Sequence, residues 1–312
     1  MNEAIFLKEK QKKSLVIYNP NSGNAINKTI IDEYERILTS YGYSTTFIPT
    51  KHTNHATEIM KNVEDIDIVF AIGGDGTLNE VVNGNFYRKD KLIICPIPSG
   101  TCNDVATMLG YKKDPIENLK IALEGEVHSM DIGTINEQPF VYVVGMGKLM
   151  NIPYETKGIE KKKSGYLAYI KEFLNQIADR IKRYKAEITI DGVKLDDKYS
   201  LIMVSNSNHI AGINNFYKDV CLNDGEFEVL LCKSKNMKNF ISSFLNFFLS
   251  KKTKDIISVK GKEINIKLLD IPDKNWCIDG EKFNYYGNKY TIKSDCKMKF
   301  LAPKNNTNQL FK

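Results

Sequence analysis

The sequence has few of the residues that hold zinc or cross-link small proteins. It contains four histidines and six cysteines among 312 residues, and no two cysteines are spaced as C-x-x-C. With so few histidines and no paired cysteines, neither a zinc site nor a disulfide framework is expected. Scattered cysteines in a chain of this size are typical of reduced thiols, so we predict a cytoplasmic protein.

Long apolar runs are also missing. The most apolar stretch, Phe240–Leu249, is about half the ~20 residues that a membrane-spanning helix needs. The segment Met1–Lys13 has no apolar core of the length typical of a signal peptide. These absences favour a protein that contacts a membrane from one side at most.

The charge balance is only mildly basic. The chain has 44 Lys and Arg against 38 Asp and Glu, a formal net charge of +6. This excess suits anionic partners such as phosphates or an acidic membrane surface. No basic block is interleaved with aromatic residues, so nucleic acid is not expected as a partner.

The first half of the chain alternates strand-like and helical patterns. Short apolar runs lie at 14–19, 44–49, 67–72 and 92–98. Helical spacing lies between them at 26–38, 55–63 and 77–86. This alternation predicts an α/β domain with a doubly wound, mostly parallel sheet and helices on both faces.

The pattern changes after Asp131. Short β-rich segments follow, separated by turn pairs such as Asp191-Gly192 and Asp224-Gly225, and two helical stretches at about 166–183 and 237–249 interrupt them. This predicts an all-β second domain, a mostly antiparallel β-sandwich. We therefore expect an α/β domain at 1–131, a sandwich domain at 132–294, a C-terminal segment at 295–312 that returns to the first domain, and an active site in the cleft between them.

A glycine-rich stretch, AIGGDGTLNEVVNG, follows the third strand-like run. Gly73, Gly74 and Gly76 lack a Cβ, so they can adopt positive φ and let backbone N–H groups approach a phosphate. The helix that follows directs its positive end at this loop. A carboxylate beside phosphates is repulsive unless a metal mediates, so Asp75 favours a Mg²⁺-nucleotide over a bare anion.

The same stretch has an ordinary structural alternative, a tight turn followed by a helix cap. Thr77 is the predicted N-cap, with Glu80 three residues on as its capping-box partner. Two further turn segments, NPNSG at 19–23 and PSGTCND at 98–104, follow other strands of the same sheet. Thr50 follows the second strand, although it could merely turn the chain. Carboxyl ends of parallel strands share one edge, so we expect these segments to converge.

Three of these motifs together resemble a known family. GGDGTLNEVVNG, the upstream NPNSG and the downstream P-x-G-T-x-N-D are similar to the catalytic domain of the diacylglycerol kinase and lipid kinase superfamily, and to the soluble bacterial diacylglycerol kinases in particular. The resemblance covers nearly the whole chain, including YET at 154–156, LNDGEF at 222–227 and IDGE at 278–281. NAD kinases and phosphofructokinases share the GGDG core but lack this combination.

The resemblance implies ATP binding along the predicted sheet edge, with Mg²⁺ and water linking Asp75 to the nucleotide. Asn103 and Asp104 would shape the same pocket, unless they only cap the helix that follows. The implied ATP-binding residues are Asn19, Pro20, Asn21, Ser22, Gly23, Thr50, Gly73, Gly74, Asp75, Gly76, Thr77, Leu78, Asn79 and Thr101.

The implied reaction moves the γ-phosphoryl group of Mg-ATP to the hydroxyl of diacylglycerol, giving phosphatidic acid. A carboxylate can accept the hydroxyl proton. Asp279 and Glu281 are the candidates, since residues two apart in a strand face the same side, and Gly280 leaves room for a substrate. The resemblance points to this segment, and we favour Glu281 as the base. A plain Asp-Gly hairpin turn is the alternative.

The resemblance also implies a structural Mg²⁺ at LNDGEF. Its ligands would be the side chain of Asp224 and main-chain oxygens of Cys221 and Glu226, a set that suits Mg²⁺. Asn223 stands where relatives can carry a second acid, and another Asp-Gly turn is the alternative.

Two segments could approach an anionic membrane, where the lipid acceptor lies. Lys161–Lys163 precede the first helical stretch, although a solvated loop would look the same. The second helical stretch could insert at the interface or pack on the sandwich. It carries Phe240, Phe244, Phe247 and Phe248, and is followed by Lys251 and Lys252.

Other functions stay open at this point. The same fold could phosphorylate another lipid, such as phosphatidylglycerol or a sphingoid base, because the sequence does not define the acceptor. An NAD kinase and a non-catalytic nucleotide-binding regulator are further alternatives, and a homodimer remains open.

Overall fold

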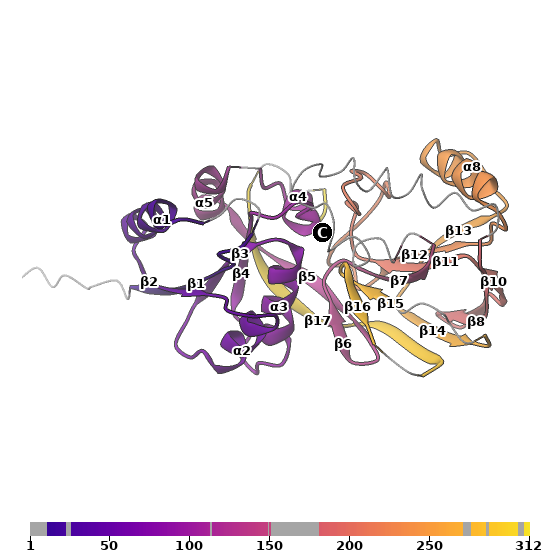
Figure 1. Ribbon diagram of the computed structural model, residues 1–312, viewed down its shortest axis with the longest axis horizontal. Helices are drawn as coiled ribbons and strands as arrows, with labels where there is room; N and C mark the ends of the chain where they lie inside the picture. The colour runs from indigo at the N-terminus through magenta and orange to yellow at the C-terminus, as the bar shows by residue number, and fades with distance from the viewer. Residues whose placement is uncertain are drawn as a thin grey trace, which may run out of the picture.

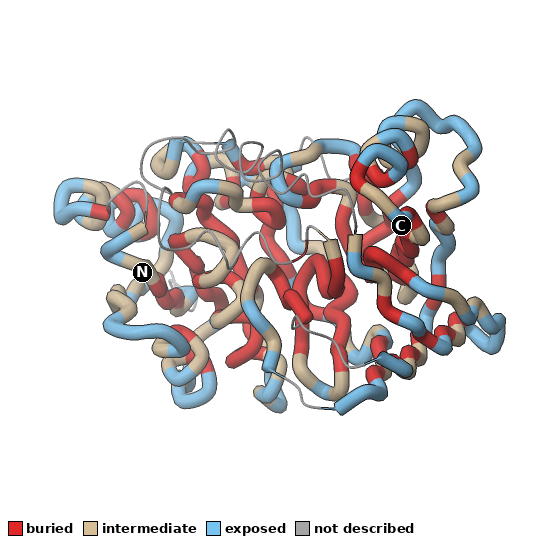
Figure 2. The backbone as a smooth tube through the Cα atoms, turned by 45° about the vertical axis from the view of Figure 1, so that its right-hand side comes forward, coloured by how far each residue is buried: buried red, intermediate tan, exposed pale blue. Residues whose placement is uncertain are grey.

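A computed structural model describes residues 11–22, 26–112, 114–148, 150, 181–270, 276–284, 287–304 and 309–312. Two β-sheets form its frame, and helices cover the outside of the first half (Figure 1). The strands inside the molecule are buried, whereas the outer faces of helices and the loops are exposed (Figure 2). No helix within the described ranges has the length and apolarity needed to span a bilayer.

Four parallel strands in the order β4-β3-β1-β2 organise the first half. Helices α1 and α5 lie on one face of this sheet, and α2 and α3 lie on the other (Figure 1). The predicted doubly wound sheet is therefore confirmed. The elements are β1 (Lys12–Tyr18), α1 (Lys28–Ser40), β2 (Tyr43–Pro49), α2 (His55–Asn62), β3 (Ile68–Gly73), α3 (Asp75–Phe86), β4 (Ile93–Pro98), α4 (Asp104–Met108) and α5 (Pro115–Leu123).

Local sequence explains these elements. Every residue of β3 is buried, as expected for a central strand with helices on both faces. Asn27 caps α1, since its side-chain oxygen accepts a hydrogen bond from the backbone N–H of Ile30 at 3.0 Å. Tyr34, Ile37 and Leu38 of α1 are buried against the sheet, so its apolar spacing forms the inner face.

Two long antiparallel strands, β5 (Glu126–Ile135) and β17 (Lys289–Ala302), run through both halves. Near its end β17 pairs with β5 on one side and, at Phe300, in parallel with Ile94 of β4 on the other. The predicted boundary between residues 131 and 132 lies inside β5, and the division into domains stays a prediction. The large sheet continues through β14 (Glu263–Leu268), β8 (Tyr184–Ile190) and β10 (Asp197–Tyr199), with β6 (Gln138–Phe140) and β9 (Val193–Lys194) at its sides.

A second sheet of six antiparallel strands faces the second half of the large sheet, which confirms the predicted sandwich. Large buried side chains from both sheets, such as Phe140, Phe227 and Trp276, fill the space between them. In sheet order the strands are β13 (Ile256–Gly261), β12 (Phe227–Cys232), β11 (Leu201–Ser205), β7 (Val143–Gly147), β15 (Trp276–Ile278) and β16 (Glu281–Phe283).

The predicted helix at 237–249 is α8 (Met237–Phe248), which lies on the outside of the second half (Figure 1). It packs through Met237 and Phe240, which are buried, while Leu245 and Leu249 are 58% and 64% exposed. The helix therefore covers the sandwich with one face and leaves an apolar edge toward solvent. The predicted helix at 166–183 lies almost entirely outside the described residues, and Lys161–Lys163 lie outside them.

Candidate active site

The turn segments that follow the parallel strands lie together at one edge of the sheet. The backbone N–H of Asn19 donates to the carbonyl of Ile72 at 3.1 Å, and that of Ser99 donates to the carbonyl of Gly73 at 2.9 Å. The hydroxyls of Ser22 and Ser99 are 2.8 Å apart. The segments after β1, β3 and β4 are thus joined directly by hydrogen bonds.

The neighbouring ends of β1 and β2 are joined in the same way. The N–H of Thr50 donates to the carbonyl of Tyr18 at 2.8 Å. Thr101, in the segment after β4, is exposed, and Pro20 and Asn21 are exposed in the segment after β1. Gly23 lies outside the described residues.

The glycine loop uses its glycines for close approach rather than for positive φ. Gly73, Gly74 and Gly76 all lack positive φ, so that expectation is wrong. A Cβ on Gly73 would lie 2.4 Å from the Thr77 side chain, and a Cβ on Gly100 would lie 2.6 Å from the Cα of Gly74. A side chain at Gly73 would collide with the first turn of α3, and one at Gly100 would push apart two loops that touch backbone to backbone.

The predicted capping box is also wrong. Helix α3 begins at Asp75 with Gly74 as its N-cap, so Thr77 lies inside the first turn. The Glu80 carboxylate accepts instead from the backbone N–H groups of Asn54 at 2.7 Å and Ala56 at 3.1 Å. Glu80 therefore caps the start of α2 from a neighbouring helix, a contact that local sequence does not reveal.

Acidic side chains gather beside the glycine loop. Burial and the nearby Asp104 carboxylate raise the pKa of Asp75, against the opposing effect of the N–H groups of Asn103, Asp104 and Val105 at the start of α4. Burial raises the pKa of Tyr142 well above its usual range, and the surrounding carboxylates of Asp104, Asp75 and Asp279 add to it. The site therefore favours a positively charged ligand.

Asp104 is held by a loop from the second half of the chain. Its carboxylate accepts from the N–H groups of Ala211 at 2.9 Å and Gly212 at 3.0 Å, and lies 3.2 Å from Nε2 of His209. Burial lowers the pKa of His209, but Asp104, Asn214 and Asp75 outweigh that effect, so the pKa is raised. Sequence reasoning missed His209, because a single histidine in a loop carries no local signal.

Asn103 occupies the N-cap position of α4, but its side chain makes no capping bond to that helix. Asn103 adopts left-handed backbone geometry with φ 53°, and α4 has no side-chain capping bond. The Asn103 side chain accepts from the N–H of Gly100 at 2.9 Å and donates to its carbonyl at 2.8 Å. This closes the segment after β4 into the tight turn that touches Gly74.

The DGE segment is a two-residue hairpin turn, so the expectation that Asp279 and Glu281 share one face of an extended strand is wrong. Asp279 and Gly280 have φ values of 47° and 82°, and Ile278 pairs with Glu281 across the turn. Two positive φ values in a two-residue loop define a type I′ turn, the geometry that Asp-Gly favours.

Asp279 is fully engaged by hydrogen-bond donors. Its carboxylate accepts from the N–H groups of Val141 at 2.6 Å, Tyr142 at 3.0 Å and Val143 at 3.0 Å, and from Nδ2 of Asn79 at 2.7 Å. Burial raises its pKa, while these donors oppose the shift. Asp279 thus ties the helix after the glycine loop to the second half of the chain.

Glu281 lies where the two halves meet at the glycine loop. Its Oε1 is 3.6 Å from the position that a Cβ on Gly76 would occupy. Glu281 is partly exposed, whereas Asp279 is buried. The two acids of the DGE segment therefore have different surroundings.

A series of hydrogen-bonded amide side chains supports the contact between α3 and the DGE segment, and sequence reasoning missed it. Nδ2 of Asn83 donates to the carbonyl and to Oδ1 of Asn79 at 2.8 and 2.9 Å. Nε2 of Gln138 donates to Oδ1 of Asn83 at 2.6 Å. The amide of Asn79 is thereby oriented to donate to Asp279. The i, i+4 spacing of the two asparagines on α3 was the one visible signal.

The predicted metal turn lies apart from these residues and packs on β5. The N–H of Gly225 donates to Oδ2 of Asp131 at 2.6 Å. Asp224 accepts from the N–H of Glu226 at 3.1 Å and lies 3.6 Å from Nζ of Lys260. Lys297 lies 3.5 Å from Asp131 and donates to the carbonyl of Asn223. Two ammonium groups therefore already balance the acids of this turn.

Known proteins resemble this chain over most of its length. Residues 13–135 match the family model described as the diacylglycerol kinase catalytic domain. A curated protein of Bacillus subtilis (strain 168) named "Diacylglycerol kinase" is 31% identical over 233 residues, which are 74% of this chain and 77% of that protein. A Staphylococcus epidermidis protein of the same name is 30% identical over 284 residues, 89% of this chain and 87% of that protein.

A solved structure shares the fold. A crystal structure of a diacylglycerol kinase from Bacillus anthracis str. Sterne superposes with a TM-score of 0.73 at 24% identity, over 95% of this chain and 98% of that one. The motifs of the glycine loop lie within the residues that the family model matches. Sequence and fold agree over most of the chain, and it therefore belongs to the diacylglycerol kinase family of lipid kinases.

Proposed function

We propose that this kinase transfers the γ-phosphoryl group of ATP to the hydroxyl of diacylglycerol and releases phosphatidic acid. ATP is the co-substrate that the kinase family implies. The observation that supports the proposal most strongly is the junction at the positive end of α3. There the Glu281 carboxylate lies 3.6 Å from the position that a Cβ on Gly76 would occupy. A phosphate-binding site and a carboxylate base are then adjacent.

The nucleotide would bind along the sheet edge. Its phosphates would meet the glycine loop and the first turn of α3, and the segments at 19–23 and around Thr101 would flank it, with Thr50 beside them. The close approach of Gly74 and Gly100 supports this proposal, because a phosphate can reach backbone N–H groups only where side chains leave room. Leu78 and Asn79 would shape the helix behind the loop.

Mg²⁺ fits the charge of this site. Burial and Asp104 raise the pKa of Asp75, which means that a cation beside Asp75, in addition to His209 beside Asp104, would favour its ionised form. When bound, Mg²⁺ would neutralise charge on the phosphates and on the Asp75 carboxylate. Asp75 would orient the nucleotide through the ion and its water shell.

We assign the role of general base to Glu281 and a positioning role to Asp279. The Asp279 oxygens already accept four hydrogen bonds, so they have little capacity to accept a substrate proton. Glu281 is partly exposed and lies beside Gly76, in the first turn of α3. It would accept the proton of the lipid hydroxyl as the new P–O bond forms.

A second Mg²⁺ would have a structural role at the LNDGEF turn. Asp224 would supply a carboxylate oxygen, and Cys221 and Glu226 would supply carbonyl oxygens. The acids of this region attract positive charge, but Oδ1 of Asp131 already faces the Lys297 ammonium at 3.5 Å. Lys260, 3.6 Å from Asp224, would have to move aside, so we expect weak binding there.

The lipid has to be reached at a membrane surface. The exposed edge of α8, with Leu245, Phe248 and Leu249, supports contact with the interface, and Lys251 and Lys252 directly after it would face anionic headgroups. Peripheral binding of this kind would bring the site to its substrate.

The test is a labelling experiment with γ-labelled ATP and Mg²⁺. Diacylglycerol micelles, phosphatidylglycerol micelles, a sphingoid base and NAD are offered separately to the wild type, to Glu281→Gln and to the matched surface variant Glu35→Gln. We expect label in phosphatidic acid, reduced about 10²- to 10⁴-fold in Glu281→Gln and unchanged in Glu35→Gln. Label in another lipid would change the acceptor, and label only in NADP would refute the proposal.

A further inference from the structure

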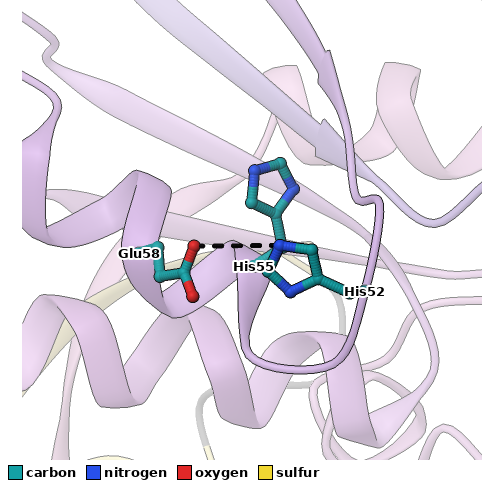
Figure 3. A group of neighbouring side chains, drawn as sticks. All are labelled: His52, His55 and Glu58. Carbon is teal, nitrogen blue, oxygen red and sulfur yellow. Dashed lines mark ion pairs between the residues drawn. The ribbon is translucent and has the colours of Figure 1, made fainter.

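Two histidines and a glutamate form a compact group in the loop between β2 and α2. His52, His55 and Glu58 each offer one nitrogen or carboxylate oxygen, and these atoms all lie within 4.8 Å of one another (Figure 3). His55 is the first residue of α2 and Glu58 follows one turn later, while His52 lies in the preceding loop. Within the described residues, this is the one such group of three potential metal ligands.

His52 has the hydrogen bonding of a metal ligand. Its Nδ1 lies 3.0 Å from the carbonyl oxygen of Thr53, a bond that requires the proton on Nδ1. The lone pair of the neutral ring is then on Nε2, which faces Oε2 of Glu58 at 3.9 Å (Figure 3). Metal-bound histidines commonly donate their other N–H to a backbone carbonyl in this way.

His55 needs a small rearrangement. Its Nδ1 accepts from the backbone N–H of Lys51 at 3.1 Å, so one ring nitrogen is already engaged. Binding a metal costs this bond in either case: through Nδ1 the ion replaces the Lys51 N–H, and through Nε2 the ring proton moves to Nδ1, which can then no longer accept. Losing one neutral hydrogen bond changes an equilibrium constant by about tenfold. A third metal–ligand bond can outweigh this loss. The two histidine rings also need little movement to share an ion, because their centroids are already 4.8 Å apart.

The group is open to solvent and its side chains can adjust. The side chains of His52 and Glu58 are 56% and 59% exposed, so little desolvation opposes rotation. Two ligands on one tetrahedral Zn²⁺ lie about 3.4 Å apart, given metal–ligand bonds of about 2.1 Å. The ligand atoms now lie within 4.8 Å of one another, so each spacing has to close by at most about 1.4 Å, a distance that side-chain rotation can supply.

We propose that His52, His55 and Glu58 bind a transition-metal ion, Zn²⁺ before Mg²⁺, with water at the remaining position. Two imidazoles and one carboxylate match the preferences of Zn²⁺, Cu²⁺ and Ni²⁺, whereas Mg²⁺ prefers oxygen ligands alone. This site is separate from the Mg²⁺ sites of the proposed function and does not depend on that function.

A bound ion would join the loop to α2. Glu80 of α3 already holds the same loop through the N–H groups of Asn54 and Ala56. The ion would therefore stiffen a loop that connects Thr50, at the sheet edge, with the helix that packs beside α3. Slower amide exchange at His52–Asn54 is the local signature.

The test is zinc titration calorimetry of the full chain after removal of metals by chelation. The variants are the double variant His52→Gln/His55→Gln, Glu58→Gln, and the control Glu64→Gln, which removes an exposed acid just beyond α2. We expect one zinc site that is about a hundredfold weaker in the double variant, weaker in Glu58→Gln, and unchanged in Glu64→Gln. Millimolar Mg²⁺ should not displace Zn²⁺.

A second readout keeps the test independent of folding. Thermal unfolding without metal should be the same for wild type, Glu58→Gln and Glu64→Gln, and the double variant should lose no more than the bond between His55 and the Lys51 N–H. Zn²⁺ should slow amide exchange at His52–Asn54 only in the wild type and in the Glu64→Gln control. Equal zinc isotherms for wild type and double variant would overturn the proposal. So would zinc binding that leaves exchange in this loop unchanged.

Discussion

Substituting the two acids of the DGE segment should affect stability very differently: strongly for Asp279 and hardly at all for Glu281. In Asp279→Ala, three backbone N–H groups and the Asn79 amide lose their shared acceptor in a buried region. Each buried unsatisfied donor costs about 1–3 kcal/mol, but such costs are not additive, and water can enter the space that the side chain leaves. Breaking one buried charged network costs about 3–5 kcal/mol, which is the loss we expect.

That loss would be a large part of the stability of the protein, because domains unfold with about 5–15 kcal/mol. Glu281→Gln changes a partly exposed side chain and should stay within about 0.5 kcal/mol of wild type. The assay is urea unfolding followed by circular dichroism, with the slope of free energy against urea compared between variants. A loss below about 1 kcal/mol in Asp279→Ala would refute the positioning role, since that role depends on the four bonds.

Two other predictions test contacts beside α3: the contact of the glycine loop with the segment after β4, and the pair of His209 with Asp104. Gly100→Ala places a Cβ 2.6 Å from the Cα of Gly74, so it should separate the two loops and lower the free energy of unfolding by about 1–3 kcal/mol. It should also weaken ATP binding in a calorimetric titration. An unchanged ATP affinity would contradict the proposed role of these two loops in binding ATP. His209 has a raised pKa in the folded state, so its pair with Asp104 stabilises fully below the unfolded pKa of about 6.5 and less as pH rises through the folded pKa. The difference in Tm between wild type and His209→Gln should therefore be largest near pH 6 and shrink toward pH 9, and a constant difference would argue against an ionised pair.

Apolar runs and strand ends were readable from the sequence, because they depend on local pattern. β3 is a continuous buried run, and the segments after β1, β3 and β4 converge simply because parallel strands end at one edge. The role of Gly73 was misread, since sequence alone does not separate a glycine needed for φ from one needed for close approach.

Contacts between distant parts of the chain were not readable. Glu80 looked like a capping-box partner of Thr77, but it caps α2 because tertiary packing brings Asn54 within reach. The pairing of His209 with Asp104 likewise joins residues that share no local pattern. The Asp279-Gly280 pair was a visible turn signal, and its positive φ values remove the strand alternation that would have put Asp279 and Glu281 on one face.

The path of β17 has a consequence for dissecting this protein. The matched catalytic segment at 13–135 includes β4 and β5, but β17, from the far end of the chain, lies between them near Phe300. A fragment ending at residue 135 would leave a one-strand gap and expose the unpaired edges of both strands, which invites aggregation. The catalytic segment defined by sequence is thus not an autonomous folding unit, and a fragment meant to isolate it would need the last strand grafted back.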